Sequence, residues 1–238
     1  MYADQIQNKR EYQEDRYLMI EDIVPGYDYF AVFDGHGGAA VSDLANSTLH
    51  KFVKIYLSEN ISPVTSLYKS FEDLHNLINP QIGFGCGSAA VVGLRDKQKN
   101  KVYIANSGDS RAIRKGGDIT IDHKPNLSKE YNRIVQGGGG VFFVDGVPRL
   151  NGDLALSRAF GDFRLNPVIT WKPDIYTLDY DGLLILASDG LWDVMNTNEV
   201  VNMFGRMEKT NDRKTICNQL FKEAVQRGSG DNITILVV

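Results

Sequence analysis

Residues 30–38 read Phe30-Ala31-Val32-Phe33-Asp34-Gly35-His36-Gly37-Gly38. Four apolar residues, the pattern of a buried strand, run directly into an acid, an imidazole and three glycines. An acid at the open end of a buried strand contributes little to a core, because a buried charge needs a partner. It is well placed to hold a metal ion. One Asp-Gly pair is also a common turn, so the stretch gains weight only because the chain repeats it.

The same arrangement, a strand-like run followed by an acid, recurs along the whole chain. Residues 187–193 read Ala187-Ser188-Asp189-Gly190-Leu191-Trp192-Asp193, and shorter forms occur at Gly108-Asp109 and Gly230-Asp231. Together with an acidic pair near the N-terminus, the acids at strand ends are Glu14, Asp15, Asp34, Asp109, Asp189, Asp193 and Asp231. Any one of them is typical of a turn or a helix cap. As a group, they indicate a site for hard, oxygen-binding cations, Mg²⁺ or Mn²⁺ rather than zinc.

The bulk composition limits the classes of partner and compartment. The chain has 238 residues with 26 basic and 30 acidic side chains, a net charge of −4, and no basic run, so we expect no nucleic-acid partner. No apolar stretch approaches the length of a membrane span, and the N-terminus has no signal-like segment. Two isolated cysteines, Cys86 and Cys217, favour a reducing compartment. We therefore expect a monomer in the cytoplasm, with a nuclear location left open, and no membrane association.

Hydrophobic periodicity predicts the main elements. Residues 17–20 and 27–33 are expected to form a hairpin, and two amphipathic helices are expected over residues 41–57 and 64–78. Short β-rich runs at 88–94, 101–105, 111–114 and 119–121 suggest a meander. A short helix over 129–136, a later helix over 213–225 and strands at 183–187 and 233–238 complete the pattern. Strands in blocks and helices in pairs predict α+β layers in one domain, residues 1–238.

Two phosphatase motifs and one nucleotide-binding motif can be tested on the residues. A cysteine-nucleophile phosphatase needs an arginine six residues after its cysteine, but Val92 and Glu223 stand at those positions. Asp34-Gly35-His36 matches the start of the binuclear metallophosphoesterases, but the Asn-His pair that they require is absent. The glycines at 85–87 fit a dinucleotide fingerprint, but they lead from a helix into a strand, which is the wrong order.

Seven motifs in order make the chain similar to the metal-dependent type 2C protein serine/threonine phosphatases. They lie at residues 10–15, 32–38, 105–111, 122–125, 151–162, 189–193 and 231–232, and the resemblance runs from about Ile6 to Val238. The resemblance implies a central β-sandwich of two mostly antiparallel sheets flanked by pairs of α-helices. It also implies hydrolysis of phosphoserine and phosphothreonine esters in phosphorylated proteins. The implied attack is made directly by a metal-bridging water or hydroxide, with no phosphoenzyme intermediate.

The resemblance also implies roles for the acids. Asp34 would bridge two Mg²⁺ or Mn²⁺ ions. Glu14 and the carbonyl of Gly35 would complete the shell of one ion. Asp189 and Asp231 would hold the other. Asp109 and Asp193, with Asp189, resemble the weaker third-metal site of the family, and Asp15 resembles an acid that orients metal-bound water.

Two further residues carry implied catalytic roles. Arg10 matches the arginine that binds phosphate, for which a planar guanidinium is better suited than an ammonium. His36 matches the proposed general acid of the family. Such an acid is needed because an alkoxide is a poor leaving group without a proton.

The chain departs from the family pattern in three places. Ala89 stands where a threonine is usual, and Asn8 replaces a glycine before Arg10. Asn tolerates a left-handed backbone, so the turn at Asn8 is expected to survive. The segment between Asp162 and Pro173 is short, which leaves the substrate preference open. Two alternatives therefore stand beside the phosphoprotein phosphatase: an inactive scaffold with the same fold, and a hydrolase of small phosphate esters.

Overall fold

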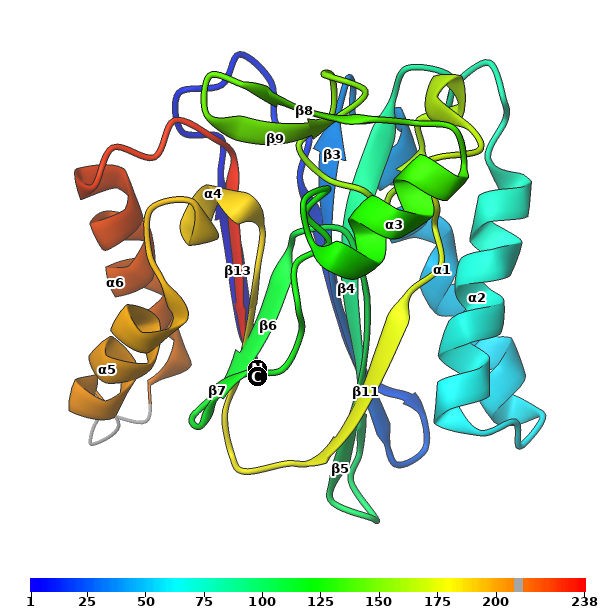
Figure 1. Ribbon diagram of the computed structural model, residues 1–238. Coiled ribbons are helices and arrows are strands. Elements are labelled where there is room, and N and C mark those ends of the chain that lie inside the picture. Colours follow the sequence, from blue (N-terminus) through cyan, green and yellow to red (C-terminus); the bar gives the residue numbers. More distant parts are fainter. Residues whose placement is uncertain (208–211) are drawn as a thin grey trace.

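Two β-sheets pack face to face and carry helices on both outer faces (Figure 1). The computed structural model describes residues 1–207 and 212–238. The larger sheet is built from β2 (Arg16–Val24), β3 (Tyr27–His36), β4 (Gly87–Asp96), β5 (Lys101–Ser107), β10 (Phe160–Gly161) and β11 (Asp174–Asp179). The smaller sheet is built from β1 (Tyr2–Ile6), β6 (Arg111–Arg114), β7 (Gly117–Asp118), β12 (Leu184–Ala187) and β13 (Ile233–Val237).

The strand orders are β11-β5-β4-β3-β2, with β10 beside β4, and β1-β13-β12-β6-β7. The ladders in both sheets are antiparallel. The helices α1 (Ala40–Ser58) and α2 (Pro63–Leu77) cover the larger sheet. The helices α4 (Asp189–Trp192), α5 (Thr197–Met207) and α6 (Arg213–Gln226) cover the smaller one. The predicted α+β sandwich of two mostly antiparallel sheets with flanking helix pairs is therefore confirmed.

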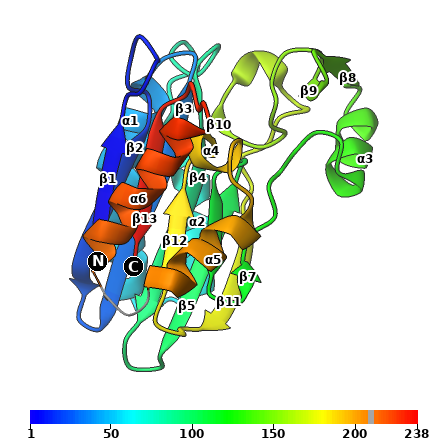
Figure 2. The same ribbon diagram turned by 90° about the vertical axis from the view of Figure 1, so that its left-hand side faces the viewer.

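A third group of elements projects from one end of the sandwich. It consists of α3 (Ser128–Gln136) and the hairpin of β8 (Val141–Val144) and β9 (Val147–Leu150), which stand away from the two sheets in Figure 2. The short 3-10 helix at Phe163–Leu165 follows β10. Within the described ranges, no helix combines the length and apolar character needed to cross a bilayer.

The central strands of both sheets are buried on both faces, which explains their continuous apolar runs. In β3, Ala31 and Phe33 pack toward the helices, whereas Phe30 and Val32 pack between the sheets. Strand β13 alternates in the same way, with Ile235 toward α6 and Leu236 between the sheets. Side chains alternate along a strand, so a strand with helices on one face and a sheet on the other needs apolar residues at every position.

The predicted meander over residues 88–121 is only partly correct. Strands β4 and β5 pair as expected, but β6 crosses to the other sheet and pairs with β12. The chain turns at Gly108, whose φ of +117° lies in the region that favours glycine. The last run was also misplaced, since the short β7 is Gly117–Asp118 and precedes Ile119. Apolar runs identify strands, but they do not say which sheet a strand joins.

The topology brings the strand-end acids to one end of the sandwich. Strand β12 runs antiparallel to β13, so the residues after Ala187 lie beside those before Ile233. Strand β13 also pairs with β1, which places the segment after Ile6 at the same end.

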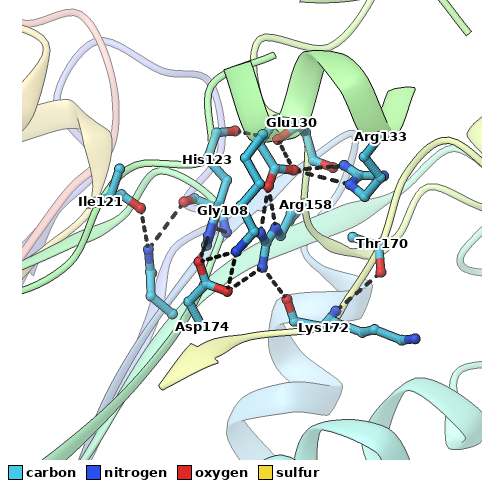
Figure 3. Close-up of polar contacts among 12 residues, drawn as sticks. Gly108, Ile121, His123, Glu130, Arg133, Arg158, Thr170, Lys172 and Asp174 are labelled. Atoms are coloured by element: carbon cyan, nitrogen blue, oxygen red, sulfur yellow. Dashed lines mark hydrogen bonds and ion pairs between the residues drawn. The ribbon is translucent and has the colours of Figure 1, made fainter. Parts of the chain in front are cut away.

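A buried ionic network ties the projecting elements to the larger sheet (Figure 3). Glu130 of α3 accepts hydrogen bonds through Oε1 from Arg158, at 2.5 Å from Nη2, and through Oε2 from Arg133 at 2.8 Å. Arg158 also donates to Asp174 at the start of β11, at 3.0 Å. His123 joins the same carboxylate at 3.3 Å and accepts from the backbone N–H of Gly108 at 3.1 Å. The network therefore runs from α3 to the turn that carries Asp109.

The charge of Glu130 is stabilised by this network. Burial raises the pKa of the Glu130 carboxyl, but the hydrogen bonds and charge of Arg158 and the hydrogen bond from Arg133 outweigh it and lower the pKa to about 2. A carboxyl whose pKa is lower in the folded state adds stability above its unfolded pKa. That contribution is lost as the pH falls through the folded value.

We expect Glu130→Gln to lower the free energy of unfolding by about 3 kcal/mol at pH 7, because it leaves the buried Arg158 and the partly buried Arg133 without their shared anion. The difference from wild type should shrink between pH 4.5 and pH 2. Urea unfolding at several pH values would measure it, with the exposed Glu72→Gln on α2 as control. A difference that did not change with pH would contradict the ionic role.

Candidate metal centre and active site

Three carboxylates form the centre of the site. Asp34 lies near the end of β3, Asp109 follows β5, and Asp189 begins α4. One oxygen from each lies within 4.8 Å of the others. The backbone N–H of Asp189 also donates to Asp34 Oδ2 at 3.3 Å, which links the two sheets directly. Acids that are far apart in the sequence therefore meet at one point.

Burial and mutual repulsion act on these acids together. Burial raises the pKa of Asp34 well above its usual range, and the charges of Asp189, Asp15 and Asp109 add to the shift. Burial also raises the pKa of Asp189, with further contributions from Asp109, Asp193 and Asp231. Carboxylates held this close are disfavoured in their charged form unless cations lie among them.

The oxygen atoms available fit a hard divalent cation. Asp109 is 2% exposed, and its Oδ1 has no hydrogen-bond partner among the residues that the structure describes. A buried carboxylate oxygen without a partner is unfavourable, and a cation is one way to satisfy it. The central ligand group offers oxygen alone, which suits Mg²⁺ or Mn²⁺.

Asp15 forms hydrogen bonds that connect the segments around this centre. Its side chain is buried, and Oδ2 accepts from Ser188 Oγ at 2.8 Å and from Thr234 Oγ1 at 2.7 Å. Burial raises the pKa of Asp15 to about 6, although the hydrogen bonds from Thr234 and Ser188 work against that shift. Asp15 thus joins the N-terminal segment to the end of β12 and to β13.

Glu14 and Gly35 meet where the N-terminal segment crosses β3. Glu14 Oε1 accepts the backbone N–H of Gly38 at 2.5 Å. A side chain on Gly35 would overlap the backbone oxygen of Glu14 and the hydroxyl of Ser42, so glycine permits this close approach. The backbones of Glu14 and Gly35 therefore lie in close contact, and the carboxylate of Glu14 is held against the glycine turn that follows.

Asn232 clamps the N-terminal loop against the loop that carries Asp231. Its side-chain oxygen accepts the N–H of Glu14 at 2.8 Å, and its side-chain nitrogen donates to the carbonyls of Gln7 and Tyr12, both at 3.0 Å. Its backbone N–H donates to Asp231 Oδ1 at 2.7 Å. One amide side chain therefore sets the spacing between Glu14 and Asp231.

Arg10 lies at the mouth of the site and is paired with Asp231. The distance from Arg10 Nη2 to Asp231 Oδ2 is 2.5 Å, and the arginine side chain is 53% exposed. The preceding turn contains Asn8 with a φ of +52°, as expected for the residue that replaces glycine. Arg10, Asp193 and Asp231 line a cavity of about 350 Å³, together with Gly190, Val194 and residues 228–230. Because half of the Arg10 side chain is exposed, its guanidinium can reach a ligand in this cavity.

Asp193 stands apart from the central three acids. It follows α4, its backbone N–H bonds to Asp189 at 2.8 Å, and its side chain is exposed. Asp109 lies with Asp34 and Asp189. Asp109 also forms an ion pair with Lys124, in which Lys124 Nζ lies 2.6 Å from Asp109 Oδ2.

His36 is oriented by a buried aspartate. The distance between His36 Nε2 and Asp162 Oδ2 is 2.6 Å, and Asp162 is fully buried. Since a carboxylate only accepts, Nε2 carries a hydrogen and Nδ1 is the ring nitrogen left for other partners. Gly87 makes the pair possible, because a methyl group at this position would overlap both side chains.

Sequence reasoning assigned no role to Asp162, Asn232 or Lys124, although each stands in a motif that we recognised. Asp162 follows Gly161 in the same Gly-Asp pattern that marks Asp109 and Asp231, so a stricter reading of that pattern would have selected it. No local signal distinguishes Asn232 or Lys124, because their partners lie far away in the sequence.

Comparisons with known proteins identify one family. Residues 3–233 match the family model described as protein phosphatase 2C. The chain is 37% identical over 246 residues to "Probable protein phosphatase 2C 59" of Arabidopsis thaliana, covering 97% of this chain and 76% of that protein. It is 40% identical over 222 residues to "Probable protein phosphatase 2C 41" of Oryza sativa subsp. japonica, covering 88% and 75%.

Two solved structures share the fold. A Caenorhabditis elegans sex-determining protein superposes with a TM-score of 0.86 at 27% identity, and the match covers 99% of this chain and 63% of that one. A serine-threonine phosphatase 2C from Toxoplasma gondii superposes with a TM-score of 0.80 at 24% identity, covering 99% and 92%.

The repulsion among the acids predicts how the protein responds to metal. With Mn²⁺ at about 100 times its Kd, binding stabilises by about 2.7 kcal/mol, which for a chain of this size raises the Tm by about 5–10 °C. Asp189→Asn should remove most of this shift, yet match or exceed the wild-type Tm in EDTA, because one buried charge is gone. Thermal unfolding with and without Mn²⁺ would measure both effects, with the exposed Asp179→Asn as control. An undiminished Mn²⁺ shift in Asp189→Asn would count against the metal centre.

Proposed function

Because the chain belongs to the protein phosphatase 2C family of metal-dependent serine/threonine phosphatases, we propose that it hydrolyses phosphoserine and phosphothreonine esters in phosphorylated proteins. The proposed reaction is direct transfer of the phosphoryl group to water, without a phosphoenzyme. The observation that carries the proposal is the convergence of Asp34, Asp109 and Asp189 beside an exposed arginine.

We assign the acids to two principal cations, Mg²⁺ or Mn²⁺, and a weaker third. Asp34 would contact both principal ions, with Glu14 and the carbonyl of Gly35 on one, and Asp189 and Asp231 on the other. Asp109 and Asp193, with Asp189, would hold the third. When bound, such ions activate water and offset the charge of a phosphoryl group. Asp15 would hold this ligand set in place through Ser188 and Thr234.

Arg10 is the proposed phosphate ligand. Its guanidinium offers paired N–H groups that match two phosphoryl oxygens, and it borders the cavity beside Asp193 and Asp231. An ester carried on a protein side chain can enter this cavity from outside, because Arg10 lies at the surface. To bind the phosphate, Arg10 would break its ion pair with Asp231.

His36 is the proposed general acid. Its Nε2–H is held by Asp162, so the ring is fixed in orientation and Nδ1 can deliver a proton to the departing serine or threonine oxygen. The carboxylate also stabilises the positive charge on the imidazole before the proton leaves. Asp162 acts through His36 and is therefore a positioning residue.

The remaining proposals concern the whole chain. We place the activity in one domain formed by residues 1–238, because β1 at one end of the chain pairs with β13 at the other. The two buried free thiols, Cys86 and Cys217, support a reducing, intracellular setting such as the cytoplasm. We propose a monomer that acts on phosphoproteins and has no nucleic-acid partner, in line with the net charge of −4.

The direct test is phosphate release from a phosphothreonine peptide with Mn²⁺ or Mg²⁺, and again after EDTA. We expect metal-dependent turnover that is lost in EDTA and in Asp34→Asn. Small phosphate monoesters assayed in parallel identify the alternative substrate class, since faster turnover of these would contradict a protein substrate. No turnover by folded protein that binds Mn²⁺ would indicate an inactive scaffold.

The proton-transfer roles predict a dependence on the leaving group. His36→Ala should slow turnover of an alkyl phosphate by about 10²–10⁴-fold and that of p-nitrophenyl phosphate much less, because nitrophenolate leaves without a proton. Asp162→Asn should show the same selectivity with a smaller loss. Mn²⁺ binding by both variants should stay close to wild type. Equal losses with both esters would contradict a general-acid role for His36.

A further inference from the structure

Lys124 occupies an unusual position for a lysine. Its ammonium lies 2.6 Å from Asp109 Oδ2, and Asp109 is almost fully buried. An ammonium at this distance forms a charge-assisted hydrogen bond with the carboxylate. Lys124 therefore places a positive charge directly on one of the acids assigned to the proposed third ion.

The two residues that precede Lys124 are both anchored. The preceding Asp122 receives two hydrogen bonds from Arg111, at 2.9 and 2.7 Å. His123 exchanges two hydrogen bonds with Gly108, one through its ring and one through its backbone N–H at 2.9 Å. Arg111 and Gly108 flank Asp109 in the sequence. Lys124 is thus held against Asp109 by contacts with the same loop that carries this acid.

The two oxygens of Asp109 have different surroundings. Oδ2 accepts from Lys124, whereas Oδ1 is buried and has no hydrogen-bond partner among the described residues. Oδ1 is therefore open to a cation, but any cation there lies next to a fixed positive charge. Two like charges a few ångströms apart at a partly buried site repel each other, and the repulsion is weaker where water enters.

We propose that Lys124 competes with a divalent cation for the carboxylate of Asp109, and so sets the affinity of the weakest ion in the centre. The inference rests on the proposed function of the acid cluster. The physical reason is that a resident ammonium already neutralises part of the negative charge that would attract a cation to Asp109.

Mn²⁺ binding tests the proposal without any assay of activity. Free Mn²⁺ is followed by electron paramagnetic resonance in titrations of wild type, Lys124→Met, Lys124→Arg and Lys101→Met. Lys101 is the matched control, because it also pairs with one aspartate, Asp179, at 2.9 Å. We expect Lys124→Met to bind its weakest Mn²⁺ about tenfold more tightly. Lys124→Arg and Lys101→Met should stay near wild type. Adding Asp109→Asn to Lys124→Met should abolish the gain.

Thermal unfolding separates this role from a structural one. Lys124→Met should melt below wild type in EDTA, where Asp109 loses its counter-ion, and recover in saturating Mn²⁺. A lysine that only braces the loop would lower the Tm in both conditions. Unchanged or weaker Mn²⁺ binding by Lys124→Met would overturn the inference and leave the proposed function intact. Absence of Mn²⁺ binding by wild type would overturn both.

Discussion

Repulsion among carboxylates is the constraint around which this end of the molecule is built. Oxygens of Asp34, Asp109 and Asp189 lie within 4.8 Å of one another, a distance at which two unit charges repel by about 3–4 kcal/mol at an effective dielectric constant of 20. Flexible loops would relieve such repulsion by moving apart. Here the acids stand on strand ends that belong to two packed sheets, so the positions of the charges are set by the core. The fold thus holds together the charges that a cation requires.

Contacts between distant parts of the chain complete this support. Asp15 is bonded to Ser188 and Thr234, and Asn232 to Gln7, Tyr12 and Glu14, so residues more than 170 positions apart define one corner. On the opposite side, the network of Glu130, Arg158 and Asp174 reaches Gly108 through His123. The projecting helix α3 is therefore connected to the turn of Asp109 by hydrogen bonds, although it lies outside the sandwich.

Local patterns predicted the local structure and the acids, but not the partners. The helices over residues 41–57 and 64–78 followed from their apolar spacing, and the strand-end acids followed from repeated short motifs. The hydrophobic pattern did not indicate that β6 joins the second sheet, because a strand buried on both faces has the same apolar sequence in either sheet. The edge strands β1 and β11, with half-polar sequences, also passed unnoticed. The role of Asp162 depends on its contact with His36, and that of Lys124 on its contact with Asp109. Both contacts are formed only when the chain folds.

Two basic side chains of the site, Arg10 and Lys124, differ in their exposure and in how firmly they are held. Arg10 and Lys124 each pair with one of the proposed metal ligands, but Arg10 is half exposed at the mouth whereas Lys124 is less exposed and follows two anchored residues. On the proposed assignments, a cation that takes Asp231 Oδ2 removes the partner of Arg10 and leaves its guanidinium available for phosphate. Binding of the cation and of the phosphate then favour each other, since each weakens the competing Arg10–Asp231 pair. Lys124 has no such release, so on the same assignments its charge would continue to oppose an ion at Asp109. One site would then hold ions of unequal affinity with a ligand set made of oxygen alone.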